Sequence, residues 1–157
     1  MSYQSSDVLY LIPKKDRPIW PDVGEVLPVE ASEMMTIPLL GWVAAGQPVD
    51  LFEHHESISV PANMVRKDTY ALRVRGDSMI DDNIEDGDVI VVEKRATAEN
   101  GQSVVAMING ETVTLKKFYI EKDGVRLQPA NPSLNPIYLK NGDIQILGIV
   151  MGVIRTP

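Results

Sequence analysis

Short apolar runs separated by strong turn signals constrain the fold of this chain more than any other feature. One run, DVIVVE at residues 88–93, is continuous and β-branched, and another, QSVVAMI at 102–108, leads directly into Asn109-Gly110. Asn-Gly is the strongest short-range signal for a β-hairpin. Asp123-Gly124 gives a second such signal between ETVTLKKFYIEK and VRLQPA. We therefore expect a mainly β fold, a twisted sheet or partly closed barrel of short hairpins.

Two further strands are expected at YALRVR, residues 70–75, and within DIQILGIVMGVIR, residues 143–155. The helical candidates are short, PANMV at 61–65 and MIDDNI at 79–84. No run of helical periodicity competes with the strand pattern, so helices are expected to contribute little to the fold.

Residues 1–40 differ from the rest, because they hold five of the eleven prolines of the chain. Proline at this density prevents a long helix. DVLYLI, residues 7–12, predicts one short strand, and the remainder is expected to be extended. A helix-turn-helix needs helices of ordinary length, so no direct DNA-binding motif is expected. We expect an extended N-terminal arm or linker at 1–40 and a folded domain at 41–157.

Composition excludes several classes of function. The net charge of −7 disfavours a general nucleic-acid-binding surface, and the lack of cysteine excludes disulfides and thiolate metal sites. No apolar run reaches the length of a membrane span, so a cytoplasmic protein is expected. The phosphate-loop, dinucleotide and zinc-helix motifs are absent, so we expect neither a metal nor a cofactor. His54 and His55 are adjacent and would point to opposite sides of a strand, which disfavours joint chelation.

The stretch RGDSMID, residues 75–81, places a serine directly after a predicted strand. The preceding glycine permits a sharp turn, and a short helical start follows. This arrangement can expose the hydroxyl of Ser78 and direct the N–H groups of Asp77 and Ser78 at a developing oxyanion. The alternative is a serine in an ordinary turn or at a helix N-cap. The acidic residues around and after this turn are expected to be solvated: Asp81, Asp82, Glu85, Asp86 and Asp88.

A nucleophilic serine without histidine requires another base, and lysine is the known alternative. The candidates lie in TVTLKKFY, residues 112–119. Strand alternation puts Lys116 on the face of Thr114 and Lys117 on the opposite face. A lysine among apolar neighbours loses solvation, so its pKa falls. Spacing alone does not choose between the two lysines, and both also fit a solvated strand face.

The stretch WVAAGQPV, residues 42–49, contains small residues and a glycine in an otherwise strand-like run. An ordinary turn would explain this pattern. The other interpretation is that the peptide bond between Ala45 and Gly46 is left sterically open to attack.

The order of VAAGQP, RGDSMID, EDGDVIVV and TVTLKKF resembles the LexA/UmuD family of self-cleaving regulators, which use a Ser-Lys dyad. The resemblance covers about residues 37–155, and PANPSLNPIYL and ILGIVMGVIR look like the closing segments of the family. It implies that Ala45-Gly46 is the scissile bond, Ser78 the nucleophile and Lys116 the base. It also implies a bacterial or phage origin, a homodimer, and cleavage stimulated by RecA filaments on single-stranded DNA.

Three alternatives remain open on the sequence. The proline-rich arm looks like that of UmuD, whose removal activates an error-prone DNA polymerase, and the start at Met1 favours this alternative. The core motifs look more like LexA, so a repressor core lacking its helix-turn-helix also fits. A non-catalytic binding module of the same fold is the third alternative. The presence of scissile bond, serine and lysine together favours a serine-type peptidase over that module.

Overall fold

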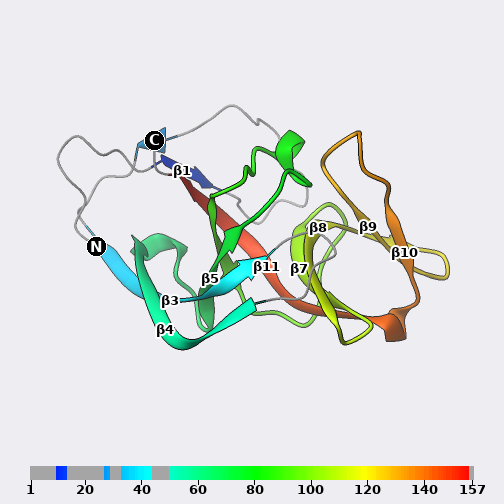
Figure 1. Cartoon of the computed structure of the whole chain (residues 1–157), viewed down its shortest axis with the longest axis horizontal. Helices are drawn as coiled ribbons and strands as arrows, with labels where there is room; N and C mark the ends of the chain where they lie inside the picture. Colours follow the sequence, from blue (N-terminus) through cyan, green and yellow to red (C-terminus); the bar gives the residue numbers. More distant parts are fainter. Residues whose placement is uncertain (1–9, 14–26, 29–32, 44–49, 156–157) are drawn as a thin grey trace.

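The computed structural model describes residues 10–13, 27–28, 33–43 and 50–155 (Figure 1). At 10–13, 27–28 and 50–55 it describes the backbone alone. Eleven strands join in one sheet in this part of the chain. The strands are β1 (Tyr10–Pro13), β2 (Leu27–Pro28), β3 (Met34–Val43), β4 (Asp50–Pro61), β5 (Thr69–Val74), β6 (Val89–Glu93), β7 (Ser103–Ile108), β8 (Thr112–Glu121), β9 (Gly124–Gln128), β10 (Ile137–Leu139) and β11 (Ile144–Arg155).

The sheet is open and mixed, with the order β10-β9-β8-β7-β11-β6-β5-β3-β4, and β1 pairs with β11 and β2 outside this path. β11 joins the two halves, because its first half pairs with β7 and its second half with β6. Figure 1 shows this long strand crossing the centre of the molecule. Two bulges, between Ile146 and Gly148 and between Val150 and Gly152, interrupt its ladders, and bulges increase local twist and bending. The predicted mainly β class is confirmed, as an open sheet.

Both predicted hairpins are present, and one of their turns differs from the prediction. Asn109 and Gly110 have positive φ angles of 53° and 69° in the β7–β8 turn, which is the backbone conformation that these residue types favour. In the β8–β9 hairpin Glu121 pairs with Gly124, so the central residues are Lys122 and Asp123 instead of Asp123 and Gly124. Gly124 instead begins β9. Glycine is required at this position because a Cβ atom would collide with the backbone carbonyl oxygen of Leu139 on β10.

The helical segments in the described residues are single turns, as the sequence indicated. They are the 3₁₀ helices η1 (Ala62–Met64), η2 (Ile80–Asp82) and η3 (Asn141–Asp143). The third of these was not predicted. β1 covers the end of the strand predicted at 7–12, of which residues 7–9 lie outside the described residues.

The core divides into three clusters of buried side chains along the sheet. The central cluster joins strands from both halves of the chain with the turn that contains η2. It includes Val43 from β3, Met79 from that turn, and Val105 and Leu115 from β7 and β8. Because each of these side chains is at most 2% exposed, the central cluster fixes how the turn lies against β7 and β8.

Candidate active site

Ser78 lies in the turn between β5 and η2, as the sequence predicted. Gly76 supplies the sharp bend with a φ of +86°, and its N–H donates to a carboxylate oxygen of Asp86 at 2.8 Å. The N–H of Ile80 donates to the carbonyl of Asp77 at 3.2 Å and closes the turn. Ser78 itself is only 8% exposed, so the turn does not present this serine to bulk water as the sequence suggested.

The backbone N–H groups beside the hydroxyl are candidates for binding an oxyanion. Within the described part of the chain, the N–H groups of Asp77 and Ser78 donate no hydrogen bond. The carbonyl of Asp77 is held from the other side, because the side-chain amide of Asn131 donates to it at 2.9 Å. The N–H of Asp81 donates to the carbonyl of Ala130 at 2.7 Å, which ties the same turn to the segment after β9. The turn is therefore fixed at two points.

Lys116 is buried in β8, with 3% of its surface exposed. Its Nζ atom donates to Oγ1 of Thr114 at 2.7 Å and to the carbonyl of Leu115 at 3.3 Å. The bond to Thr114 confirms the predicted alternation, which put these two side chains on one face. Burial removes water from the ammonium form and lowers the pKa of Lys116 to about 8 from an ordinary value of 10.5. The predicted fall in lysine pKa therefore holds for this residue.

Lys117 occupies a different environment. Its side chain is 20% exposed, and its Nζ lies 3.8 Å from Oδ1 of Asp82. Its partner Asp82 is 5% exposed, so this contact is a largely buried ion pair that suits a structural role. The two lysines that spacing left equivalent are thus distinguished by their surroundings.

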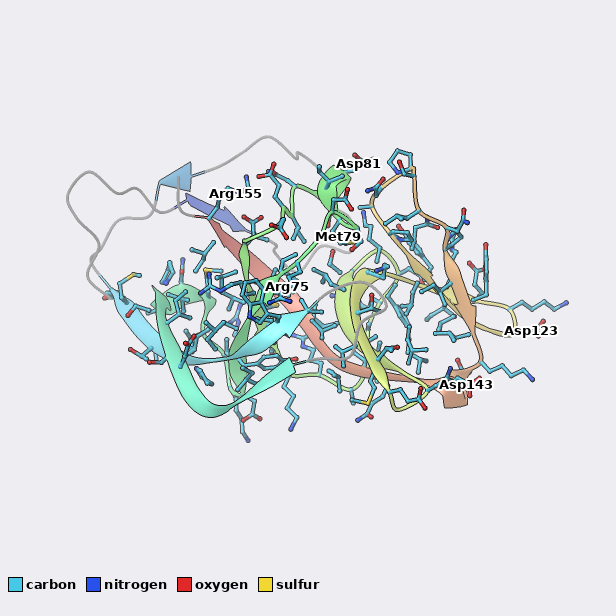
Figure 2. The ribbon with its side chains drawn as sticks, in the orientation of Figure 1. Arg75, Met79, Asp81, Asp123, Asp143 and Arg155 are labelled. Atoms are coloured by element: carbon cyan, nitrogen blue, oxygen red, sulfur yellow. The ribbon has the colours of Figure 1, made fainter. Side chains whose placement is uncertain are left out.

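Asp82 links the serine turn to the lysine strand. Only 4% of its surface is exposed, and its Oδ2 accepts a hydrogen bond from the hydroxyl of Ser103 at 2.9 Å. Ser103 on β7 is directly opposite Lys117 on β8, so both side chains reach Asp82 from neighbouring strands. Met79 adds an apolar contact surface, since it belongs to the same core cluster as Leu115. Figure 2 labels Met79 and the neighbouring Asp81 on this segment.

The expectation that the acidic residues of this region are all solvated is wrong for two of them. Asp82 is buried as described, and Asp88 is 2% exposed. Both carboxylate oxygens of Asp88 accept hydrogen bonds from Arg155 at 2.8 Å, and Oδ2 also accepts from the N–H of Glu85. Arg155 thereby connects the end of β11 to the segment after η2. No local sequence pattern around Arg155 indicated this role. Asp81, Glu85 and Asp86 are exposed, as expected.

The predicted cleavage site, Ala45 and Gly46, lies outside the described residues. β3 ends two residues earlier at Val43, which is 1% exposed and shares the central core cluster with Met79. The carbonyl of Val43 accepts a hydrogen bond from the N–H of Arg75 at 3.0 Å. The chain therefore enters the predicted cleavage segment from the strand end beside the Ser78 turn.

The two histidines that the sequence analysis considered are described only in part. The backbone of His54 and His55 lies in β4, and their side chains are outside the described residues. Among the described residues no group of His, Asp and Glu gathers in a way that could hold a metal ion. No helix in this part of the chain is long and apolar enough to span a membrane.

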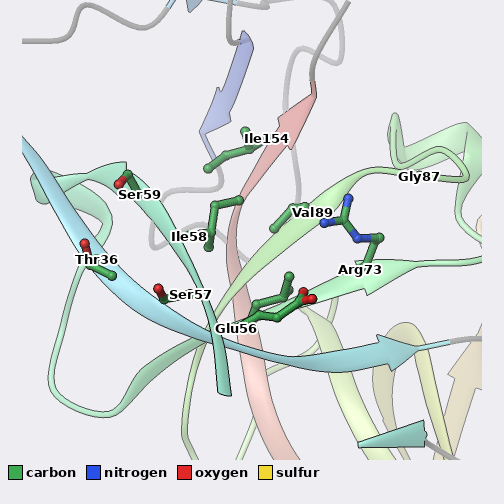
Figure 3. Close-up of a pocket in the computed structure, with 10 residues that line it drawn as sticks. Thr36, Glu56, Ser57, Ile58, Ser59, Arg73, Gly87, Val89 and Ile154 are labelled. Carbon is green, nitrogen blue, oxygen red and sulfur yellow. The ribbon is translucent and has the colours of Figure 1, made fainter. Parts of the chain in front are cut away.

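One pocket of about 440 Å³ lies away from the serine turn, between β3, β4, β5 and β11. Figure 3 shows its wall, with Arg73, Glu56 and Ile154 from three of these strands. Neither Ser78 nor Lys116 lines it. The pocket is therefore separate from the candidate active site.

Known proteins resemble this chain over most of its length. The sequence profile of the Peptidase S24-like family matches residues 38–151. The LexA repressor of Syntrophobacter fumaroxidans is 42% identical over 132 residues, which cover 83% of this chain and 63% of that repressor. The LexA repressor of Syntrophotalea carbinolica is 49% identical over 123 residues, covering 77% of this chain and 60% of the relative.

The LexA repressor of Clostridioides difficile is 44% identical over 125 residues, which cover 78% of this chain and 59% of the relative. The chain thus spans about three fifths of the length of these repressors. The profile match and the identities agree on the same part of the sequence, the part that carries the motifs around Ser78 and Lys116. The chain therefore belongs to the Peptidase S24-like family, the LexA and UmuD group that its motifs resemble.

Proposed function

We propose that this protein is a self-cleaving serine peptidase that cuts its own Ala45–Gly46 bond, with Ser78 as nucleophile and Lys116 as general base. The observation that carries this proposal is the buried Lys116, whose pKa falls to about 8, on a strand held against the Ser78 turn. At an unshifted pKa of 10.5, roughly one lysine in 3,000 would be neutral at pH 7, whereas at pKa 8 roughly one in ten is neutral. The shift therefore makes Lys116 a usable base.

The proposed chemistry needs no group beyond the chain and water. The neutral amine of Lys116 takes the hydroxyl proton of Ser78 while Oγ attacks the carbonyl carbon of Ala45. The N–H groups of Asp77 and Ser78 stabilise the resulting oxyanion. The Lys116 ammonium then protonates the nitrogen of Gly46, the peptide bond breaks, and an ester between Ala45 and Ser78 remains. Water, deprotonated by the same amine, hydrolyses this ester and restores the serine.

Mass spectrometry of the intact protein after incubation at alkaline pH tests the proposal. We expect two fragments, residues 1–45 and 46–157. Ser78→Ala should stay intact under the same conditions while keeping its fold, because this serine contributes little to the core. Gly46→Asp should also block cleavage, because it adds bulk and charge beside the attacked carbonyl. Fragments with another boundary, or cleavage by the Ser78→Ala variant, would refute the assignment.

We further propose that self-cleavage acts as a switch in the response to DNA damage, in a cytoplasmic homodimer. Support comes from the family, because the relatives quoted above are LexA repressors and the chain matches the Peptidase S24-like profile over residues 38–151. The proposed peptidase and dimerisation domain occupies residues 41–157, and 1–40 form an arm that contributes β1, β2 and the first part of β3 to the sheet. RecA filaments on single-stranded DNA should accelerate cleavage at neutral pH, where spontaneous cleavage is slow. RecA without DNA is the matched control.

A second role is favoured by the proline-rich residues 1–40, which predict an extended arm instead of a helix-turn-helix. In this alternative, cleavage removes the arm and activates an error-prone DNA polymerase, as in UmuD. Binding of the 46–157 fragment, but not of the intact chain, to such a polymerase would support this role. A chain that stays intact both at alkaline pH and with RecA filaments would instead favour a non-catalytic binding module of the same fold.

A further inference from the structure

Trp42, the second-last residue of β3, lies against Arg73 on the neighbouring strand β5 and against Arg75, which directly follows that strand. The guanidinium carbon of Arg75 is 4.2 Å from the centre of its ring, and that of Arg73 is 5.5 Å away. Both distances are within the range of cation–π attraction, for which tryptophan is the best aromatic partner. Among the residues whose side chains the structure describes, neither arginine forms an ion pair.

The same contact joins two parts of the chain that matter for self-cleavage. β3 and β5 run parallel here, with Trp42 paired to Arg73 and Val43 paired to Val74. The N–H of Arg75 donates to the carbonyl of Val43 at 3.0 Å, so the stacked residue also holds the backbone. Arg75 lies three residues before Ser78, and Trp42 lies three residues before Ala45. The arginines therefore hold the approach to the scissile bond against the approach to the nucleophile.

Successive side chains of β3 point to opposite faces of the sheet, so the end of this strand is held by an inner contact on one face and by the outer cation–π contact on the other. Val43 points inward, where it is 1% exposed among the central core residues. Trp42 is half-buried on the other face, and Arg75 is exposed beside it. The inner contact fixes the depth of the strand, whereas the outer contact resists its peeling away from β5.

We propose that Trp42, held by Arg75 and Arg73, is a positioning residue for self-cleavage that keeps the end of β3 aligned with the Ser78 turn. This inference rests on the proposed function, because it assigns a role in delivering Ala45–Gly46 to Ser78. The arginine stack increases the fraction of molecules in which the segment is delivered. It does not act on Ser78 or Lys116, so their reactivity is independent of it.

The test compares first-order self-cleavage rates of the parent, Arg75→Gln and Trp42→Ala over pH 6 to 10. We expect the plateau rate to fall by roughly fivefold in Arg75→Gln, the factor for the loss of one exposed cation–π contact of about 1 kcal/mol. Trp42→Ala should fall further, and Trp42→Phe should recover part of the rate. The pH midpoint should not move. Arg95→Gln is the matched control, because it removes the same charge from an exposed arginine that pairs with Glu93.

A second measurement separates delivery of the substrate segment from reactivity of the serine. A small fluorophosphonate reagent should label Ser78 at the same rate in the parent and in Trp42→Ala. Unchanged cleavage in both Trp42→Ala and Arg75→Gln would overturn the positioning role while leaving the proposed function intact. A fall in labelling parallel to the fall in cleavage would overturn it too, since the effect would then lie at Ser78. A parent that neither cleaves nor labels would refute the proposed function, and this role with it.

Discussion

The Nζ atom of Lys116 donates a hydrogen bond to Oγ1 of Thr114 at 2.7 Å, two residues earlier on the same strand. Thr114 is fully buried and Lys116 nearly so. An ammonium group binds a hydroxyl acceptor more strongly than a neutral amine does, because the bond is charge-assisted. The hydrogen bond to Thr114 therefore stabilises the ammonium form and counteracts part of the fall in the pKa of Lys116 that desolvation causes. It also fixes the position of Nζ.

Replacing Thr114 with valine tests this opposition. The variant keeps a similar shape and loses the acceptor, so the charged form of Lys116 is disfavoured further and its pKa should fall below about 8. The midpoint of the pH–rate profile for self-cleavage should move to lower pH. Thr114→Ser, which keeps the hydroxyl, should retain the parent midpoint. A midpoint in Thr114→Val at or above that of the parent would show that Thr114 does not stabilise the charged form of Lys116.

The pH dependence of cleavage in the parent follows from the same base. Because Lys116 must be neutral to accept the Ser78 proton, the rate should rise with pH and level off above about pH 8. Lys116→Ala should lose this rise. Lys117→Ala should keep the midpoint, since that side chain is directed to Asp82. Rates from pH 6 to 11 decide the matter, and loss of cleavage in the Lys117 variant alone would show that the other lysine is the base.

Stability should change with pH in a defined direction. The pKa of Lys116 is about 8 when folded and 10.5 when unfolded, so between these values the unfolded chain binds more protons. The free energy of unfolding should therefore rise with pH across this window, and the burial penalty of about 3 kcal/mol is fully present below it. Urea denaturation of Ser78→Ala and Ser78→Ala/Lys116→Met, at pH 7 and 10.5, measures this. The advantage of the methionine variant should shrink by about 3 kcal/mol, and a constant difference would contradict the prediction.

Two adjacent aspartates should differ sharply in their contribution to stability. Asp82→Ala removes the acceptor of the buried Ser103 hydroxyl and the carboxylate near Lys117, so it should destabilise the fold by about 1 to 3 kcal/mol. Asp81→Ala, the matched control, removes an exposed side chain and should cost less than about 0.5 kcal/mol. Urea denaturation in a Ser78→Ala background avoids interference from cleavage. Equal losses in the two variants would contradict the bridging role of Asp82.

Local chemistry explains why much of the fold was predictable. Runs such as DVIVVE form strands because β-branched side chains suit a buried, pleated surface. Asn109-Gly110 forms a turn because these residues accept positive φ. The turn around Ser78 followed from Gly76 for the same reason. The shift of the β8–β9 turn by one residue was not predictable, because Gly124 is required by the approach of β10, a strand that begins thirteen residues later.

The sequence by itself determined the strands, the turns and the residue types that could do chemistry, because each depends on neighbours within a few positions. It left Lys116 equivalent to Lys117, and it treated Asp82 like Asp81. Only the tertiary structure separated these pairs, since burial depends on which distant strands pack over a side chain. Because β7 pairs with β8, Ser103 lies opposite Lys117 and donates a hydrogen bond to Asp82. Lys116, one residue away on β8, is buried in the packed sheet. Desolvation then lowers the pKa of Lys116, and no local pattern in the sequence encodes the burial of this lysine.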